Sequence, residues 1–260
     1  MRPEQLFKSK CSEEIQKLGE NEAIAELTNS WMNAANKLKY SYHYEWQGRP
    51  IIQYPQDIVA MQELIWEVKP DLIIETGIAH GGSLVFSASM LALLDISDAI
   101  ESGSNLNPGK TKRKVLGIDI DIRAHNREAI EAHPMSSRIH MIQGSSIACN
   151  VIDQVKDIAK NYERVLVCLD SNHTHDHVLA ELKAYAPLTS VSSYCVVFDT
   201  IIEDMPTEMF PSRPWSRGNN PKTAVWEYLK NHPEFKVDKN IQHKLLVTVA
   251  PDGYLKRIKD

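Results

Sequence analysis

An alternation of strand-like and helix-like segments over residues 71–199 constrains the fold more than any other feature of this sequence. The strand-like runs are LIIE, VLGID, RIHMIQ, RVLVCLD and SYCVVFD, and helix-like segments cover residues 83–94, 124–132, 147–160 and 175–186. Strands that alternate with helices form parallel sheets with right-handed crossovers. We therefore predict an α/β fold with a Rossmann-like, doubly wound and mainly parallel sheet.

Further segments flank this core on both sides. Residues 3–38 read as helical, and an aromatic segment, YSYHYEWQGRPIIQYP, follows them. Beyond the fifth strand, TAVWEYLKNH suggests a helix, and FKVD and KLLVTVA suggest a closing hairpin. We predict an N-terminal helical arm over residues 1–50 and one α/β domain, which carries the functional site, over residues 51–260.

Composition narrows the class of partner. The chain has 260 residues and a net charge of −5, which gives no electrostatic case for nucleic acid. No apolar run approaches the roughly 18 residues of a membrane span, and the start lacks a secretory pattern. We expect a cytoplasmic protein that acts on a small molecule or a glycan, and we leave a homo-oligomer open. Two of the four cysteines, Cys168 and Cys195, lie in apolar runs and are expected to be buried thiols.

A glycine turn follows the first core strand, in the stretch DLIIETGIAHGGS. It matches the first motif of class I methyltransferases, E-x-G-x-x-x-G, with Glu75, Gly77 and Gly81, where the backbone approaches S-adenosylmethionine closely. The pattern TGxxxGxG of short-chain dehydrogenases fits less well, because Ser83 replaces its last glycine and no Tyr-x-x-x-Lys pair occurs. A purely structural turn stays open as an alternative.

Polar residues at the ends of the next strands extend this cofactor hypothesis. Asp119 ends the second strand, where Rossmann-like proteins place a carboxylate for a ribose diol. Ser145 follows the third strand where methyltransferases contact adenine, although it could equally cap the next helix. The cofactor-binding candidates are Glu75, Gly77, Gly81, Ser83, Asp119, Ser145 and Asp170.

The stretch LDSNHTHDHV after the fourth strand raises a metal hypothesis. Its spacing fails the HxHxDH pattern of zinc hydrolases, and His175, Asp176 and His177 read as the first turn of a helix. In a sheet ordered 3-2-1-4-5, Asp170 and Asp199 converge, since they end neighbouring strands. Two carboxylates without cysteine favour Mg²⁺ or a similar ion, while salt-bridged or capping roles remain the alternative.

Seven motifs together give the chain a family resemblance between about residues 42 and 256. They are EWQGRPIIQYPQD, DLIIETGIAHGGS, GIDID, LDSNHTHDHV, VVFDTIIEDMP, GNNPKTAVWEYL and PDGYLKR. With them the chain resembles the cephalosporin hydroxylase family, class I methyltransferase folds that include rhamnosyl O-methyltransferases. The resemblance implies the sheet order 3-2-1-4-5-7-6 and a Mg²⁺-dependent O-methyltransferase acting on a sugar, glycan or secondary metabolite. The alternatives are a cephalosporin-type hydroxylase or oxidoreductase, and a non-catalytic protein that binds the cofactor.

The resemblance also implies roles for individual residues. The metal site is similar to that of catechol O-methyltransferase, whose two metal carboxylates match Asp170 and Asp199. Its third ligand is Asn where this chain has Thr200, and the cephalosporin enzymes have Glu-Asp at Phe198-Asp199, so the third ligand lies among Thr200, Glu203 and Asp204. His173 stands where the catechol enzyme has its catalytic lysine and is the candidate general base. Candidate walls of the acceptor pocket are Trp46, Tyr54, Trp215, Asn219 and Asn220.

Overall fold

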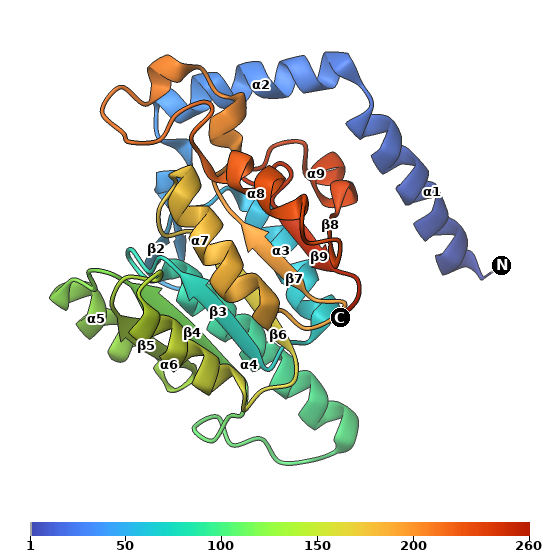
Figure 1. The fold of residues 1–260 in the computed structure, drawn as a ribbon. Coiled ribbons are helices and arrows are strands. Elements are labelled where there is room, and N and C mark those ends of the chain that lie inside the picture. Colours follow the sequence, from blue (N-terminus) through green and yellow to red (C-terminus); the bar gives the residue numbers. More distant parts are fainter. Residues whose placement is uncertain (1) are drawn as a thin grey trace.

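A central sheet dominates the computed structural model, which describes residues 2–260 (Figure 1). In these residues seven strands lie in the order β5-β4-β3-β6-β7-β9-β8. Their bounds are β3 Leu72–Thr76, β4 Lys114–Asp119, β5 Ile139–Gln143, β6 Val165–Leu169, β7 Tyr194–Val197, β8 Phe235–Val237 and β9 Tyr254–Arg257. Numbered from β3 along the chain, this order reads 3-2-1-4-5-7-6, which is the order that the family resemblance implies.

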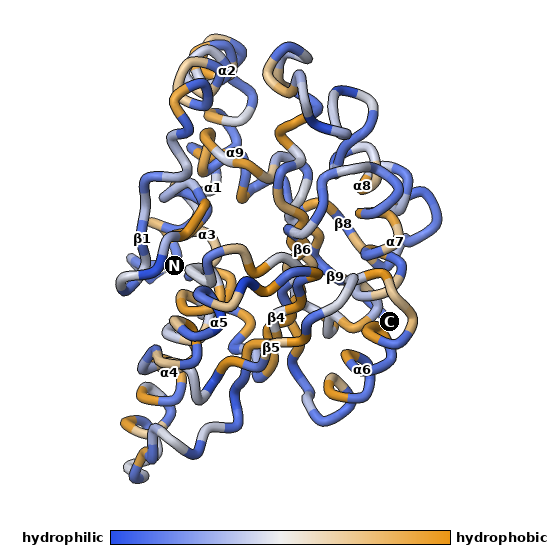
Figure 2. The backbone as a smooth tube through the Cα atoms, turned by 90° about the vertical axis from the view of Figure 1, so that its left-hand side faces the viewer, coloured by the Kyte–Doolittle hydropathy of each residue, from blue (hydrophilic) through white to orange (hydrophobic). Residues whose placement is uncertain are grey.

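The first five core strands are parallel, and β9 runs antiparallel to both of its neighbours. Every residue of β3, β6 and β7 is buried, as expected of strands that are covered on both faces. Figure 2 shows the hydrophobic residues gathered in these central strands and the hydrophilic ones in the outer loops. The predicted α/β fold is therefore confirmed.

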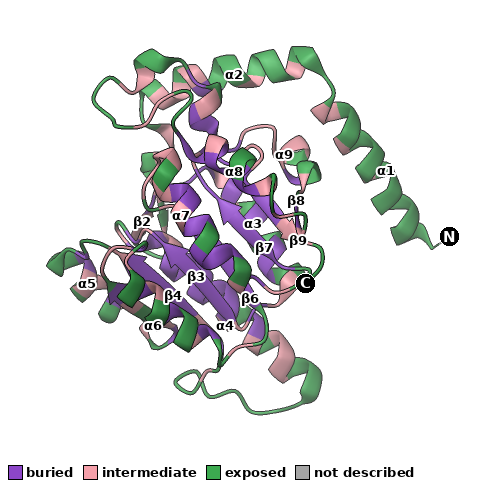
Figure 3. Cartoon of the chain, viewed as in Figure 1, coloured by how far each residue is buried: buried purple, intermediate pink, exposed green. Residues whose placement is uncertain are grey.

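Helices cover both faces of the sheet and form two hydrophobic clusters with it. One cluster joins α3 (Pro55–Val68) and α4 (Gly82–Ser102) to the strands, through side chains such as Met61 and Leu84. The other joins α6 (Cys149–Ala159), α7 (His175–Tyr185) and α8 (Pro221–Leu229), through side chains such as Val151 and Leu182. Helix α5 (Ala124–Glu131) follows β4. Figure 3 shows that burial concentrates in the sheet and in the helix faces toward it.

The segment before α3 consists of two helices and a small hairpin. Helix α1 spans Pro3–Gly19 and α2 spans Glu22–Lys37, and a short turn, Tyr40–His43, leads to strands β1 (Tyr44–Trp46) and β2 (Arg49–Ile51). Helix α1 has no buried residue, and both helices extend away from the sheet (Figures 1 and 3). The expected arm of residues 1–50 begins with Met1, which lies outside the described residues, and its boundary stays a prediction.

Helix α4 has an unusual composition for a helix of a small α/β domain. It is the one helix in residues 2–260 that is long and apolar enough to cross a membrane by length and composition, with a mean hydropathy of 1.6. Its first half is buried against the sheet, including Leu84, Val85 and Leu91. Packing in the core therefore accounts for this composition.

The closing hairpin is the one part of the predicted fold that is wrong. FKVD does contain β8, but residues 239–245 form helix α9 (Lys239–Leu245), and β9 comes only at Tyr254. KLLVTVA is not a strand because Leu246 has a positive φ of 60° and breaks the extended path. The backbone of Val249 and the hydroxyl of Thr248 bind the carboxylate of Asp57 instead of a neighbouring strand.

Candidate functional site

The glycine turn after β3 packs directly against the loop after β6. Gly77 has a φ of 90°, and a Cβ at this position would lie 2.2 Å from the carbonyl oxygen of Asp170. Gly81 has a φ of 82° and precedes the first turn of α4, where a Cβ would lie 2.4 Å from Cδ1 of Ile130. Neither position tolerates a side chain without displacement of its neighbours. Both glycines therefore have a structural reason to be present, in addition to any contact with a cofactor.

The carboxylate of Asp119 braces the same turn. Its Oδ2 accepts hydrogen bonds from the backbone N–H of Ile78 at 2.8 Å and of Ala79 at 3.3 Å, and its Oδ1 accepts one from Asp121 at 3.0 Å. Asp119 also lines an open cleft at the carboxyl edge of the sheet. It thus lies where the sequence predicts a ribose partner, and it organises the backbone there as well.

Glu75 and Ser83 lie beneath the turn, whereas Ser145 lies at the next loop. Glu75 is buried and accepts a hydrogen bond from the hydroxyl of Ser87. Burial raises the pKa of the Glu75 carboxyl, and hydrogen bonds from Ser87 and Ser83 partly oppose that shift. Ser145 follows β5 and is half-buried. It does not cap α6, whose N-cap is Ala148.

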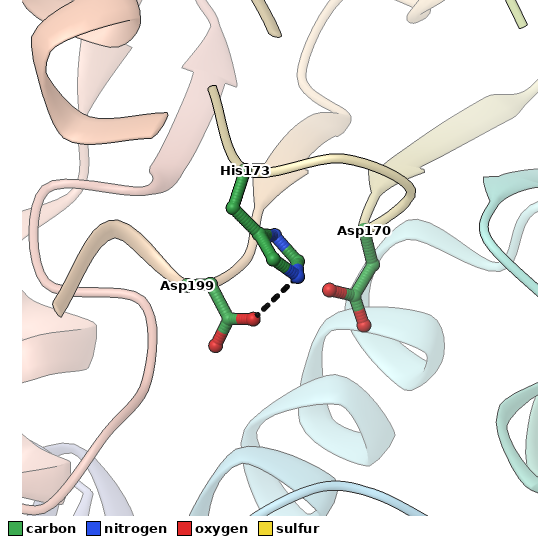
Figure 4. A group of neighbouring side chains, drawn as sticks. All are labelled: Asp170, His173 and Asp199. Carbon is green, nitrogen blue, oxygen red and sulfur yellow. Dashed lines mark ion pairs between the residues drawn. The ribbon is translucent and has the colours of Figure 1, made fainter. Parts of the chain in front are cut away.

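Three side chains of the predicted metal site converge at the carboxyl ends of β6 and β7 (Figure 4). The ligand atoms of Asp170, His173 and Asp199 all lie within 4.8 Å of one another, and no other such group of acidic, His or Cys side chains occurs in residues 2–260. His173 Nε2 lies 3.2 Å from Oδ2 of Asp199. Burial, and next to it the charge of Asp199, raise the pKa of Asp170 well above its usual range. We call these three residues the acidic cluster.

The candidates for a third metal ligand make other contacts. The Thr200 hydroxyl donates to the carbonyl oxygen of Pro251 at 2.6 Å, and Thr200 is fully buried. Glu203 accepts hydrogen bonds from the Gly218 amide and from the Asn220 side chain, and Asp204 pairs with Lys222. Thr200 therefore holds the Pro251 carbonyl, while Glu203 and Asp204 hold residues 218–222, and none of the three belongs to the acidic cluster.

An open cleft of about 490 Å³ joins the cofactor-side residues to the acidic cluster. Tyr54 and Trp215 line it, as expected of acceptor-pocket walls. The ring of Trp215 packs edge-on against His173, with 4.7 Å between the ring centroids. The hydroxyl of Tyr54 donates to the side chain of Asn36 in α2. The cleft therefore has one wall from the segment before the sheet and another from the loop 205–215.

The other three acceptor candidates do not line this cleft. The indole of Trp46 donates to Ser89 at 2.9 Å and packs in the core. The side chain of Asn219 donates to the Pro214 carbonyl, and its oxygen accepts from the backbone of His175. Asn220 is buried and caps the first turn of α8. These asparagines hold the loop before α8 in place, which corrects the expectation that they contact an acceptor.

Two residues that the sequence did not single out lie at the site. Gln53 donates through Nε2 to Oδ2 of Asp170 at 3.3 Å. Asp57 is fully buried and accepts hydrogen bonds from Thr248, from the amide of Val249 at 2.9 Å and from the hydroxyl of Tyr254 at 2.7 Å. Both belong to the QYPQD stretch before the sheet, and the local signal in the sequence was an acidic residue directly before the apolar run of α3.

Comparisons with known proteins give a family match and several relatives. The family Rhamnosyl O-methyltransferase/CmcI matches residues 38–258. The rhamnosyl O-methyltransferase of Mycobacterium bovis (strain BCG / Pasteur 1173P2) is 29% identical over 206 residues, which cover 77% of this chain and 73% of the relative. That of Mycobacterium leprae (strain TN) is 27% identical over 214 residues, which cover 82% of each chain.

Solved structures show the same fold. The structure described as "cmcI-D160 Mg-SAM" has a TM-score of 0.54 and 19% sequence identity, and the alignment covers 84% of this chain and 78% of that one. The family match extends over the glycine turn, the acidic cluster and all strands of the central sheet. This chain therefore belongs to the rhamnosyl O-methyltransferase/CmcI family.

Proposed function

We propose that this protein transfers a methyl group from S-adenosylmethionine to a hydroxyl group of a sugar, glycan or secondary metabolite, with the help of Mg²⁺. The observation that carries the proposal is the position of the acidic cluster. Asp170, His173 and Asp199 line the same side of the sheet as the glycine turn, and Gly77 and Asp170 are in direct contact through the backbone. A methyl donor and a hydroxyl acceptor would therefore meet at one edge of the sheet.

The residues around the glycine turn suit the methyl donor. The turn offers close backbone approach at Gly77 and Gly81, and Asp119 presents a carboxylate to the cleft for a ribose diol. Glu75 and Ser83 line a second, smaller pocket of about 30 Å³ next to the cleft, which we call the small pocket. Ser145 lies on the loop that follows β5, and we assign it to contact the adenine end of the methyl donor.

The acidic cluster suits a hard divalent cation. Asp170 and Asp199 provide carboxylate oxygens, which Mg²⁺ prefers over nitrogen and sulfur ligands. When bound there, the cation would act as a Lewis acid that lowers the pKa of an acceptor hydroxyl. The pKa of Asp170 is raised mainly by burial and then by Asp199, so a positive charge between the two acids would relieve their repulsion. The third protein ligand stays open, because Thr200, Glu203 and Asp204 are engaged elsewhere.

His173 is the residue we assign as general base. Its Nε2 faces the space between the two aspartates, and Trp215 packs against its ring and fixes the plane of the imidazole. The oxygen of the acceptor forms its new bond to the methyl carbon as the carbon–sulfur bond breaks, and the hydroxyl proton passes to Nε2 of His173.

The acceptor is assigned by chemical class only. Tyr54 and Trp215 supply aromatic walls to the cleft, and aromatic faces suit the apolar faces of a sugar ring. The curated relatives are named rhamnosyl O-methyltransferases, which supports a sugar hydroxyl as the acceptor. The expected cytoplasmic location and a homo-oligomer remain predictions.

Oxidation is less well supported than methyl transfer. A non-haem iron oxygenase of the common type uses two histidines and one carboxylate, whereas the acidic cluster has one histidine and two carboxylates. A protein that binds the cofactor without turnover would need no base beside the acceptor site. Both alternatives are separated from methyl transfer by the following experiment.

The test is mass spectrometry of acceptors incubated with the protein, S-adenosylmethionine and Mg²⁺. A panel of nucleotide sugars, rhamnosylated glycans and vicinal diols is scored for a gain of one methyl group and for equal formation of S-adenosylhomocysteine. A product that gains oxygen instead would indicate a hydroxylase. Tight binding of the cofactor without any product across the panel would favour the non-catalytic alternative.

A further inference from the structure

Gln53 has one satisfied and one unsatisfied polar atom next to the acidic cluster. The residue lies between β2 and α3 and is only 7% exposed. Its Nε2 donates to Asp170 Oδ2, whereas its Oε1 is buried and has no hydrogen-bond partner. A buried carbonyl oxygen without a donor is unfavourable, and in native proteins the donor comes from the protein, from an ordered water or from a ligand.

Gln53 also lies at the boundary between two cavities. Gln53, Gly77 and Asp170 line both the cleft and the small pocket. The small pocket extends under the glycine turn, and its walls are mainly apolar, with Ile58, Met61 and Phe86 among them. A ligand whose polar end reaches this pocket would pass Gln53.

The charge of the small pocket indicates what that polar end is. Asp57, Glu75 and Asp170 line it, and none of its lining residues within the described chain is Lys, Arg or His. The carboxylate of Asp57 already accepts hydrogen bonds from three groups, and that of Glu75 accepts one from Ser87. Asp57 and Glu75 are buried and Asp170 is half-buried, and these acids without a basic partner favour a cationic occupant. The unpaired Oε1 of Gln53 favours an occupant that carries N–H donors. A primary ammonium group meets both requirements.

We propose that Gln53 binds the α-ammonium group of the methyl donor through Oε1 while its Nε2 holds the carboxylate of Asp170. This inference rests on the proposed function, since it assigns the small pocket to the methionine end of S-adenosylmethionine. A glutamine suits the position because it accepts a hydrogen bond on one side and donates one on the other. A glutamate there would bring a fourth carboxylate to the pocket and could not donate to Asp170 in its ionised form.

A nearby glutamine provides a matched control. Gln56 lies three residues further along, in the first turn of α3, and its Oε1 is also buried without a partner. Gln56 lines neither the small pocket nor the cleft. The substitutions Gln53→Met and Gln56→Met remove the same polar atoms from side chains of the same length, but only the first changes the proposed ammonium site.

The test measures binding rather than turnover. The full chain and both variants are titrated by calorimetry with S-adenosylhomocysteine and with its deaminated analogue, which has hydrogen in place of the α-ammonium group. Chelator is present in one series and Mg²⁺ in the other. Gln53→Met should lower the affinity for S-adenosylhomocysteine roughly 10- to 100-fold, as expected for the loss of one hydrogen bond to a charged group. It should lower the affinity for the analogue less than about 2-fold. Gln56→Met should leave the ratio of the two affinities unchanged.

Several outcomes would overturn the inference. An equal loss for both ligands would mean that Gln53 acts through packing or through Asp170, and the proposed function would survive. If Gln53→Met reduces the effect of Mg²⁺ on ligand affinity but leaves the ratio of the affinities for the two ligands unchanged, Oε1 binds the cation instead. Failure of the unmodified protein to bind either ligand would reject the proposed function and this inference together. If Gln53→Met does not unfold cooperatively, Gln53→Leu replaces it, and the same ratio decides.

Discussion

His173 Nε2 and Asp199 Oδ2 lie 3.2 Å apart, within hydrogen-bonding distance (Figure 4). In this arrangement Nε2 carries the hydrogen and Asp199 accepts it, so the lone pair that a general base needs is not available at that nitrogen. A cation held by Asp199 would compete for the same carboxylate oxygen and release the imidazole. The contact therefore links a cation on Asp199 to the hydrogen bonding of the proposed base.

Replacement of His173 tests its role as the base. His173→Ala should lower turnover roughly 10²- to 10⁴-fold and leave cofactor binding nearly intact, because proton transfer acts mainly on the transition state. The loss should shrink as pH rises, since deprotonated acceptor becomes available without the imidazole. His175→Ala is the control, because His175 contacts Thr223 and Glu227 outside the acidic cluster. Turnover is measured over a range of pH values and Mg²⁺ concentrations. Recovery at high Mg²⁺ instead of high pH would make His173 a metal ligand, and near-normal turnover under all of these conditions would reject both roles.

The two aspartates should both be needed for a response to metal. Chelator should abolish turnover and Mg²⁺ should restore it, and Asp170→Asn or Asp199→Asn should each behave like the chelated protein. Asp176→Asn should keep the Mg²⁺ response, since Asp176 is exposed in the first turn of α7. Calorimetric titration with Mg²⁺ and assays over a range of Mg²⁺ concentrations measure the effect. Full activity in excess chelator would end the metal assignment.

Asp119→Ala should lower the affinity for S-adenosylmethionine roughly 10- to 100-fold, because the ribose diol would lose a charge-assisted hydrogen-bond acceptor worth about 1.5–3 kcal/mol. The same change leaves three backbone N–H groups without their acceptor, so the variant should also unfold at lower temperature. Asp121→Ala, at an exposed residue of the same loop, should change neither quantity much. Calorimetry and thermal unfolding separate the two effects. An unchanged cofactor affinity in folded Asp119→Ala would remove the ribose assignment.

Asp57 should make stability depend on pH in the mildly acidic range. Burial raises the pKa of Asp57 from 3.8 to about 6, against the opposing hydrogen bonds from Thr248, Tyr254 and Val249. A folded pKa above the unfolded one means that the contribution of Asp57 is fully present below about pH 4 and is lost as pH rises through about 6. Asp57→Asn should remove this part of the pH dependence of the free energy of unfolding, which is about 1.4 kcal/mol per pH unit at most.

Denaturant unfolding of wild type and Asp57→Asn from pH 4 to 7 measures that difference. The free energy of unfolding of the variant minus that of the wild type should rise between pH 4 and 6 and level off above pH 6. Asp153→Asn, at an exposed residue of α6, serves as the comparison carboxylate. Parallel curves for wild type and Asp57→Asn would show that Asp57 does not titrate in this window.

The sequence predicts the sheet and the convergence at its edge because both follow from local patterns. Apolar runs of four to six residues marked the strands, and Asp119, Asp170 and Asp199 each follow such a run. In a parallel sheet their positions are then set by strand order alone.

Other features depend on contacts between distant parts of the chain. The partners of Asp57 come from residues 248–254, which no local pattern connects to α3. Thr200 and Asn220 have the right chemistry for a ligand or an acceptor contact, but their side chains are used within the fold by Pro251 and Glu203. Sequence gives the type of a polar side chain, whereas only the packed structure shows which partner it has.

The place of β9 in the sheet sets a condition on synthesis. This strand lies between β7 and β8, although it is the last of the three in the chain. A polypeptide that ends before Tyr254 would leave β8 without a partner and would also lack the Tyr254 hydroxyl that binds Asp57 beneath the small pocket. The nascent chain on the ribosome can therefore pair the first five core strands before β9 is made, whereas β8 gains its partner in the sheet, and Asp57 its third hydrogen-bond donor, only with β9.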